Sequence, residues 1–95
     1  MKYLAFLDFD HTPMMDMAKK AQAYEAEKKN TPEKYPKVPF DAHIMHEGKQ
    51  GFAVWEATPE QVARKVAFML PEVKYTLIPI TDAREFLKIY MEVKR

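Results

Sequence analysis

Residues 51–80, GFAVWEATPEQVARKVAFMLPEVKYTLIPI, decide the fold, because they contain the signals for a strand, a helix and a second strand in that order. The apolar run Phe52–Trp55 is rich in side chains that suit a pleated sheet. Residues 58–61 (Thr-Pro-Glu-Gln) have the pattern of a capping box, with proline at the first helical position. Apolar residues then recur at three- and four-residue spacing until Pro71 ends the helix, and a second strand begins near Tyr75.

The chain before this stretch predicts two further strands and a long helix. Residues 2–9 form a strand with two apolar faces up to Asp8, which is typical of a strand that is covered on both sides. Thr12 and Pro13 are expected to cap a helix that runs to about Lys29. The buried stripe of that helix should consist of Met14, Met17, Ala18, Ala21 and Tyr24.

A surface loop and a hairpin are expected to follow this helix. Residues 30–39 contain three prolines, which favours an extended loop. The next strand spans residues 40–47, and a turn at residues 48–51 joins it to the strand at 52–55. Near the C-terminus, Asp82 and Glu85 have the pattern of another capping box. They precede an amphipathic helix whose apolar residues are Phe86, Leu87, Ile89, Tyr90 and Val93.

The element order is therefore β-α-β-β-α-β plus a C-terminal helix, which places the chain in the α+β class. Right-handed crossovers and the central hairpin turn this order into a ferredoxin-like antiparallel sheet with strand order 4-1-3-2. Both main helices then cover one face of the sheet, and the other face keeps apolar residues exposed. We expect this open face to be buried in a two-fold homodimer, with the C-terminal helix capping one edge.

Composition limits the class of protein. A chain of 95 residues with 47% hydrophobic residues predicts a single domain over residues 1–95. The net charge of +1 gives no electrostatic surface for nucleic acid or for an anionic membrane. The chain has no cysteine, and its first apolar stretch, Tyr3–Leu7, is too short for a signal sequence or a membrane span. We therefore expect a cytoplasmic protein without a nucleic-acid or membrane partner.

The second half of the chain resembles a known family. Residues 51–57 (GFAVWEA), the Pro-Glu helix start at Pro59, residues 73–80 (VKYTLIPI) and the acidic cap of the last helix are similar to a small family of uncharacterised proteins with the dimeric α+β barrel fold. Muconolactone isomerases and small cofactor-free monooxygenases also have this fold. The resemblance covers residues 51–90 and, loosely, residues 2–7, whereas residues 8–50 depart from it. It implies the fold and the dimer, but no activity.

The first strand also resembles part of an enzyme motif. Residues 4–12 (LAFLDFDHT) are similar to the first motif of haloacid-dehalogenase-type phosphatases, Asp-x-Asp-x-Thr, in which one carboxylate attacks phosphorus and the second is the general acid/base. The chain lacks a later acidic pair to complete a Mg²⁺ site, and it is too short for the fold that positions one. We expect Asp8 and Asp10 to end a strand and not to support phosphatase activity.

Polar residues gather at the expected strand ends. Asp8, Asp10 and His11 should approach His46 and Glu47 at one edge of the sheet, where carboxylates and imidazoles could bind a metal or transfer a proton. About 10 Å separates the two strands across the strand between them, which is long for shared ligation. A rim of solvated side chains is favoured, and we expect no metal and no cofactor.

Three function classes remain open. The favoured one is a dimeric small-molecule-binding or regulatory domain with an apolar pocket between sheet and helices, where the small and flexible side chains of the first helix leave room. We expect a pocket of roughly 300 Å³ or more whose mouth opens near His11, with His11 as its polar contact. Its predicted ligand-binding residues are His11, Asp8, Asp10, Met14 and Met17. The second class is a cofactor-free isomerase or monooxygenase with His11, His46 or Glu56 as the acid/base. The third is an oligomerisation module without a ligand. Trp55 is expected in the core or in the dimer interface.

Overall fold

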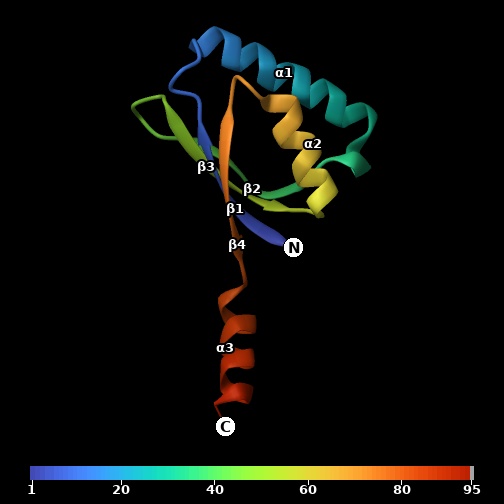
Figure 1. Ribbon diagram of the computed structural model, residues 1–95, viewed down its shortest axis with the longest axis vertical. Coiled ribbons are helices and arrows are strands. Elements are labelled where there is room, and N and C mark those ends of the chain that lie inside the picture. Colours follow the sequence, from blue (N-terminus) through green and yellow to red (C-terminus); the bar gives the residue numbers. More distant parts are fainter. Residues whose placement is uncertain (95) are drawn as a thin grey trace.

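Four strands form one antiparallel sheet in the order β2-β3-β1-β4, in a computed structural model that describes residues 1–94 (Figure 1). The strands are β1 (Lys2–Asp8), β2 (Lys37–Ile44), β3 (Gln50–Glu56) and β4 (Lys74–Ile80). The helices are α1 (Met14–Asn30), α2 (Pro59–Met69) and α3 (Ala83–Val93), with a short 3-10 helix, η1 (Pro32–Lys34). The order of the elements and of the strands confirms the predicted ferredoxin-like α+β fold.

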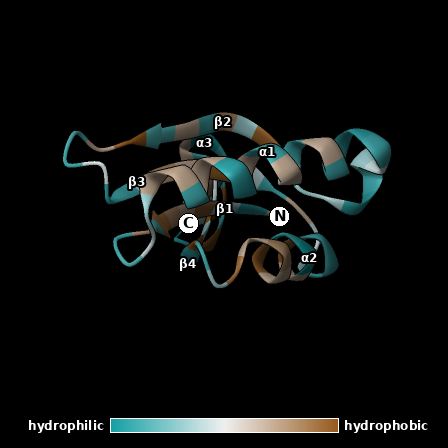
Figure 2. Cartoon of the chain, turned by 90° about the horizontal axis from the view of Figure 1, so that it is seen from above, coloured by the Kyte–Doolittle hydropathy of each residue, from teal (hydrophilic) through white to brown (hydrophobic). Residues whose placement is uncertain are grey.

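Helices α1 and α2 cover one face of the sheet and enclose the core. One buried cluster consists of Ala5, Ala53 and Trp55, on which Val62 and Val66 of α2 pack. Helix α2 has hydrophobic and hydrophilic sides (Figure 2), because its apolar residues are spaced for one helical face. The second cluster joins α1 to α2 and consists of Phe9, Tyr24, Tyr35, Met69 and Val73.

No helix in the described part of the chain, residues 1–94, covers the opposite face of the sheet. In the strand register, Leu4 of β1 lies between Val54 of β3 and Ile78 of β4, and Val54 in turn lies beside Phe40 of β2. This apolar row crosses all four strands, and its outer members are 43% (Phe40) and 44% (Ile78) exposed. The sequence-based expectation of an uncovered apolar sheet face is therefore correct for the single chain. Trp55 points to the other face and belongs to the core.

Helix α3 projects away from the rest of the chain (Figure 1), and the longest dimension of the molecule is 54 Å. Within residues 1–94 it contacts no other helix or strand. Asp82 caps it by accepting hydrogen bonds from the backbone N–H groups of Arg84 and Glu85. The backbone at Asp82 is extended (φ −52°, ψ 136°), so α3 leads onward from β4. Within residues 1–94 the helix covers no part of its own sheet, and the expectation that it caps one edge of a dimer stays a prediction.

Four local expectations were wrong. Pro13 stands at the cap position of α1 without a side-chain cap, because the Thr12 hydroxyl donates instead to the Glu72 carbonyl at 2.7 Å. The stripe of α1 does not bury Met14, which is 51% exposed. Strand β2 spans residues 37–44 instead of 40–47, and irregular pairing around Pro39 accommodates a proline in this edge strand. Tyr35, assigned to a surface loop, is part of the core.

Candidate functional site

His11 lies at the start of α1 and makes a structural contact. The Nε2–H group of its exposed ring donates to the carbonyl of Pro71 at 2.7 Å, which ties the loop after β1 to the loop after α2. Asp8 accepts a hydrogen bond from the backbone N–H of Asp10 at 3.1 Å. Asp10 itself forms an exposed ion pair with Lys49 at 3.4 Å. These polar side chains hold the strand ends together and face solvent.

The predicted convergence with His46 does not produce a metal site. Within residues 1–94, no three His, Asp or Glu side chains lie close enough together to hold a metal ion. His46 is exposed in the turn between β2 and β3. Of the two methionines predicted to bind a ligand, Met17 packs against the core cluster around Phe9. Met14 lies beside the turn at Gly48.

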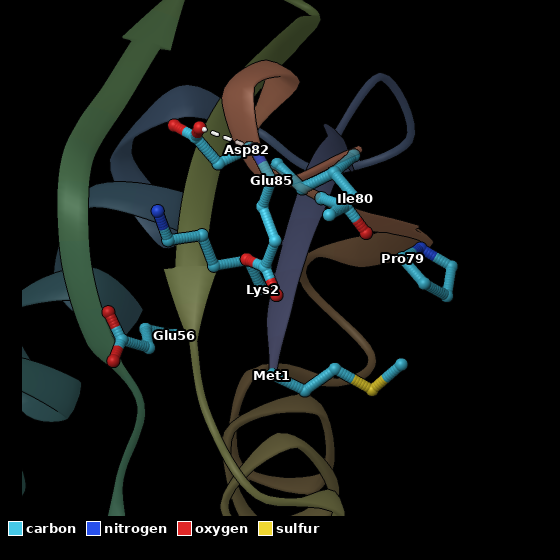
Figure 3. Close-up of a pocket in the computed structure, with 8 residues that line it drawn as sticks. Met1, Lys2, Glu56, Pro79, Ile80, Asp82 and Glu85 are labelled. Atoms are coloured by element: carbon cyan, nitrogen blue, oxygen red, sulfur yellow. Dashed lines mark hydrogen bonds between the residues drawn. The ribbon is translucent and has the colours of Figure 1, made fainter. Parts of the chain in front are cut away.

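Glu56 lies at the end of β3 on the open face, beside Lys2 of β1 and Lys37 of β2. With Lys2, Asp82 and Glu85 it lines a notch of about 340 Å³ between the strand ends and the first turn of α3 (Figure 3). The side chain of Glu56 is exposed. A carboxylate in this setting is solvated, and its cross-strand lysines account for its position. The notch therefore offers charge but little burial for a ligand.

A smaller and more enclosed pocket of about 200 Å³ lies between the sheet and the helices. Its floor is made by β1, β3 and β4, and its rim by the last turns of α1, by β2 and by α2. Its lining residues are Leu7, Glu25, Lys28, Val38, Asp41, Ala42, Ala53, Trp55, Lys65 and Tyr75. The pocket lies between sheet and helices, but not next to His11, where the sequence predicts its mouth. It lies beside the last turns of α1, whereas His11 precedes the first turn, and none of the five predicted ligand-binding residues lines it.

Lys65 and Lys28 both bring positive charge to this interior pocket. The ammonium nitrogen of Lys65 lies 4.4 Å from the centre of the Trp55 ring and 4.8 Å from the centre of the Tyr24 ring. Burial lowers the pKa of the Lys65 amine to about 8, the charge of Lys28 acts in the same direction, and the Glu25 carboxylate opposes this shift. None of the three ion pairs within residues 1–94 includes Lys65. At neutral pH the amine is therefore largely protonated, and it lies against aromatic rings with no carboxylate of residues 1–94 within salt-bridge distance.

The aromatic part of the pocket is rigidly packed. Trp55 and Tyr75 meet edge to face, with ring centres 4.9 Å apart. Burial raises the pKa of the Tyr75 hydroxyl well above its ordinary value, so this group stays a neutral hydrogen-bond donor at physiological pH. The site thus combines the Lys65 ammonium, the Tyr75 phenol and the Trp55 indole ring, with Lys28, Glu25 and Asp41 at its rim. The inner groups suit a compact ligand with an anionic end and an apolar body.

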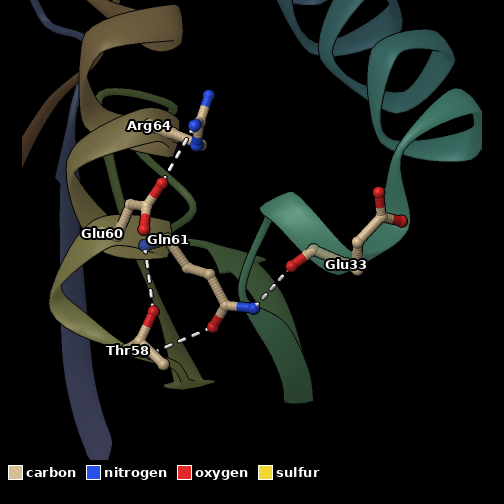
Figure 4. A network of polar contacts seen from close by, with 5 residues as sticks. All are labelled: Glu33, Thr58, Glu60, Gln61 and Arg64. Atoms are coloured by element: carbon tan, nitrogen blue, oxygen red, sulfur yellow. Dashed lines mark hydrogen bonds and ion pairs between the residues drawn. The ribbon is translucent and has the colours of Figure 1, made fainter.

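Side-chain hydrogen bonds hold the N-terminus of α2, the helix to which Lys65 belongs. The Thr58 hydroxyl accepts from the backbone N–H of Gln61 at 3.2 Å, and the Gln61 side chain accepts from the backbone N–H of Thr58 at 2.9 Å (Figure 4). The amide of Gln61 also donates to the carbonyl of Glu33 in η1 at 3.0 Å. The predicted capping box is therefore confirmed, and it also anchors α2 to the segment that leads into β2. This anchor holds the pocket wall formed by α2 against the wall formed by β2.

Lys65 was not among the residues predicted from the sequence, although a signal for it exists. Val62, Lys65, Val66 and Met69 have the spacing of one helical stripe, so the lysine occupies a position where an apolar residue is expected. A lysine in an apolar stripe either bends outward along its aliphatic stem or carries a buried charge. Here the aromatic rings of α1 and β3 enclose it.

Comparisons with known proteins identify no relative: no protein-family model matches the chain, and no curated protein or solved structure is similar to it. Within residues 1–94, no helix has the length and apolar character needed to cross a membrane.

Proposed function

We propose that the protein is a small-molecule-binding domain whose ligand occupies the interior pocket between the sheet and helices α1 and α2. The observation that carries this proposal is the amine of Lys65, which is enclosed by two aromatic rings and has no carboxylate within salt-bridge distance in residues 1–94. Burying a charge without a partner costs free energy. A ligand that brings an anionic group to Lys65 removes part of this cost.

The dimensions of the pocket limit the ligand. Its volume of about 200 Å³ equals the liquid-state share of about six or seven water molecules. This space suits a monocarboxylate with on the order of ten non-hydrogen atoms. The carboxylate would meet Lys65, the Tyr75 hydroxyl could donate to it, and the apolar body would lie along Trp55 and Ala53. The acidic residues Glu25 and Asp41 at the rim disfavour multiply charged anions.

The single tryptophan allows a direct binding test, because Trp55 lines the pocket and every change in tryptophan emission reports on it. We expect benzoate and hexanoate to change the Trp55 emission in a saturable manner. Benzyl alcohol, which has a similar size and no charge, should bind at least about tenfold more weakly, since a charge-assisted hydrogen bond contributes about 1.5–3 kcal/mol.

Two lysine variants separate pocket binding from surface attraction. Lys65→Met keeps a stem of similar length and removes the charge, so it should abolish the saturable response to benzoate. Lys19→Met, on the exposed side of α1, is the matched control and should bind like the unchanged protein. Equal benzoate binding by both variants, or no saturable response to any anion of this size, would overturn the proposal.

We also infer that the domain works as a homodimer formed through the open sheet face. The apolar row from Phe40 to Ile78 supports this, because exposed apolar surface across a whole sheet is unusual for a soluble single chain. Light scattering at micromolar concentration should give twice the chain mass of 11.2 kDa. A mass of one chain under these conditions would contradict the dimer.

One observation favours a second candidate function, a cofactor-free enzyme that uses the Lys65 amine. An amine with a pKa of about 8 is partly neutral at physiological pH and can attack a carbonyl carbon. Attack on an aldehyde or ketone, followed by loss of water, gives an imine that borohydride reduces to a secondary amine. Treatment with pyruvate and borohydride should then add one modification at Lys65, detected by mass spectrometry of peptides. Labelling spread evenly over the exposed lysines would exclude this function for Lys65.

A further inference from the structure

Helix α3 has an apolar side that packs against no other helix or strand within residues 1–94. Phe86, Ile89, Tyr90 and Val93 lie along one side of the helix, with Leu87 and Met91 beside them. These six side chains are between 50% and 75% exposed. The remaining side, which includes Arg84, Lys88 and Glu92, is charged. An amphipathic helix of 11 residues is not stable in water by itself and needs a surface on which to bury its apolar side.

The open face of the sheet is a surface of the matching kind and size. Its apolar row runs across four strands from Phe40 to Ile78. Four strands span about 14–19 Å at their usual spacing. A helix of 11 residues is about 16 Å long. The apolar side of α3 and the apolar row on the sheet therefore have nearly the same length.

The chain does not place its own α3 on its own sheet. Only Thr81 and Asp82 connect β4 to α3, and the extended backbone at Asp82 directs the helix away from the sheet (Figure 1). A second copy related by a two-fold axis can receive the helix, and it offers its own α3 in return. Such an exchange is isologous, so it closes after two chains.

We propose that α3 is an exchanged arm, which docks its apolar side on the open sheet face of a second copy of the chain. Each of the six apolar side chains can bury on the order of 100 Å², given that large side chains offer about 150–250 Å² in full. Counting both surfaces of both reciprocal contacts, the exchange buries on the order of 2,000 Å² or more, which meets the roughly 1,200–2,000 Å² of a stable interface. The inference rests on the proposed homodimer and specifies which element covers the sheet.

Charged substitutions on α3 test the arm without disturbing the fold of the single chain, because Phe86 and Tyr90 contact no other element in residues 1–94. Phe86→Glu and Tyr90→Glu should each weaken the dimer at least about 30-fold in dissociation constant, as for residues at the centre of an interface. Lys88→Glu, on the charged side of the same helix, is the control and should leave the dissociation constant unchanged. Sedimentation gives the constants, and circular dichroism verifies that all variants are folded.

Cross-linking between introduced cysteines shows where the arm docks. Each introduced cysteine reacts without competition, because the sequence contains no other cysteine. One preparation carries Tyr90→Cys on α3 with ¹⁵N labelling, and the other carries Val54→Cys in the apolar row without labelling. After mixing and treatment with a short bis-maleimide, we expect a cross-linked product that contains one labelled and one unlabelled chain. Lys88→Cys in place of Tyr90→Cys should give little of this product.

The outcomes separate the arm from the dimer itself. If the dimer persists in Phe86→Glu, and cross-links form only between two Val54→Cys chains, the arm proposal is wrong. A homodimer through facing sheets then remains. A single-chain mass, with an internal cross-link in a chain that carries both cysteines, shows that α3 folds back on its own sheet and overturns both. A single-chain mass without any cross-link overturns both as well.

Discussion

The ammonium nitrogen of Lys65 lies 4.4 Å from the centre of the Trp55 ring, so this partly buried lysine charge packs against the single tryptophan of the chain. Tyr24 covers the same nitrogen from α1, at 4.8 Å from its ring centre. Attraction to the rings offsets part of the lost hydration but does not replace a counter-ion. The charge of Lys65 is thus tolerated in the ligand-free chain and would be stabilised by an anion.

The stability of the protein should increase with pH from about 8 to about 10 because of Lys65. The folded chain releases this proton near the lowered pKa of about 8, while the unfolded chain keeps it until the ordinary value of 10.5. The unfolded state therefore binds more protons in this interval, and stability rises with pH. Lys65→Met should abolish this increase of stability with pH. At pH 7 this variant should be more stable than the unchanged protein by about 1–3 kcal/mol. Urea unfolding of both proteins at pH 7, 8, 9 and 10 measures this.

Ionisation of two tyrosines limits this increase in stability at higher pH. Burial raises the pKa values of Tyr24 and Tyr75 in the folded chain, so above about pH 10 the unfolded chain loses these protons first and stability falls. The maximum for the unchanged protein should therefore lie near pH 10. A flat profile between pH 8 and 10, or the same rise in Lys65→Met, would show that Lys65 is not buried in solution.

Filling the pocket from its rim should block binding while the fold persists. Ala42 is exposed on β2 and also lines the pocket, so Ala42→Leu adds volume there without entering the packed core. We expect the benzoate response of Trp55 to weaken at least tenfold, with a change in unfolding free energy within about 0.5 kcal/mol. Ala26→Leu, at an exposed position of α1, is the control. Unaltered binding by Ala42→Leu would place the ligand outside this pocket.

The parts of the fold that depend on neighbours in sequence were predictable, and those that depend on distant neighbours were not. The capping box of Thr58 and Gln61 is completed within one helical turn, so the pattern alone specifies it. Thr12 and Pro13 have a similar pattern, but the hydroxyl of Thr12 finds the carbonyl of Glu72, which is 60 residues away in sequence. No local pattern contains that partner.

The candidate site was missed for the same reason. Lys65 becomes a partly buried charge only because Tyr24 from α1 and Trp55 from β3 converge on it. Histidine is a residue type expected in a functional site, but the ring of His11 is hydrogen-bonded to the backbone of Pro71. The apolar open face, in contrast, follows from the alternation within β1 and β3, which sets side chains on opposite faces whatever their tertiary neighbours are.

Gly51 should tolerate no side chain, although its backbone conformation does not require glycine. A Cβ atom at this position in β3 would lie 2.6 Å from the carbonyl oxygen of His43 and 2.9 Å from Cδ1 of Ile44. Gly51→Ala must therefore push β2 away from β3, and we expect a loss of about 2–3 kcal/mol in unfolding free energy.

The comparison residue is Gly48 in the preceding turn, which has a positive φ of 73° and where an added Cβ would make an ordinary contact with Cε of Met14 at 3.7 Å. Gly48→Ala should cost only about 1–2 kcal/mol, and Gly48→Asn less, because asparagine adopts this conformation more readily. Thermal unfolding of the three variants gives the order. If Gly51→Ala were the mildest of them, the close approach of β2 to β3 would not exist in solution.

The two threonines that precede helices should respond differently to removal of their hydroxyls. Thr58→Ala should cost about 1 kcal/mol and increase amide exchange in the first turn of α2, since the hydroxyl accepts from the Gln61 amide at 3.2 Å. Thr12→Val should cost a similar amount, because it leaves the Glu72 carbonyl without its donor. Exchange in the first turn of α1 should then stay unchanged, while exchange around Glu72 increases. Faster exchange at the start of α1 in Thr12→Val would mean that Thr12 caps this helix after all.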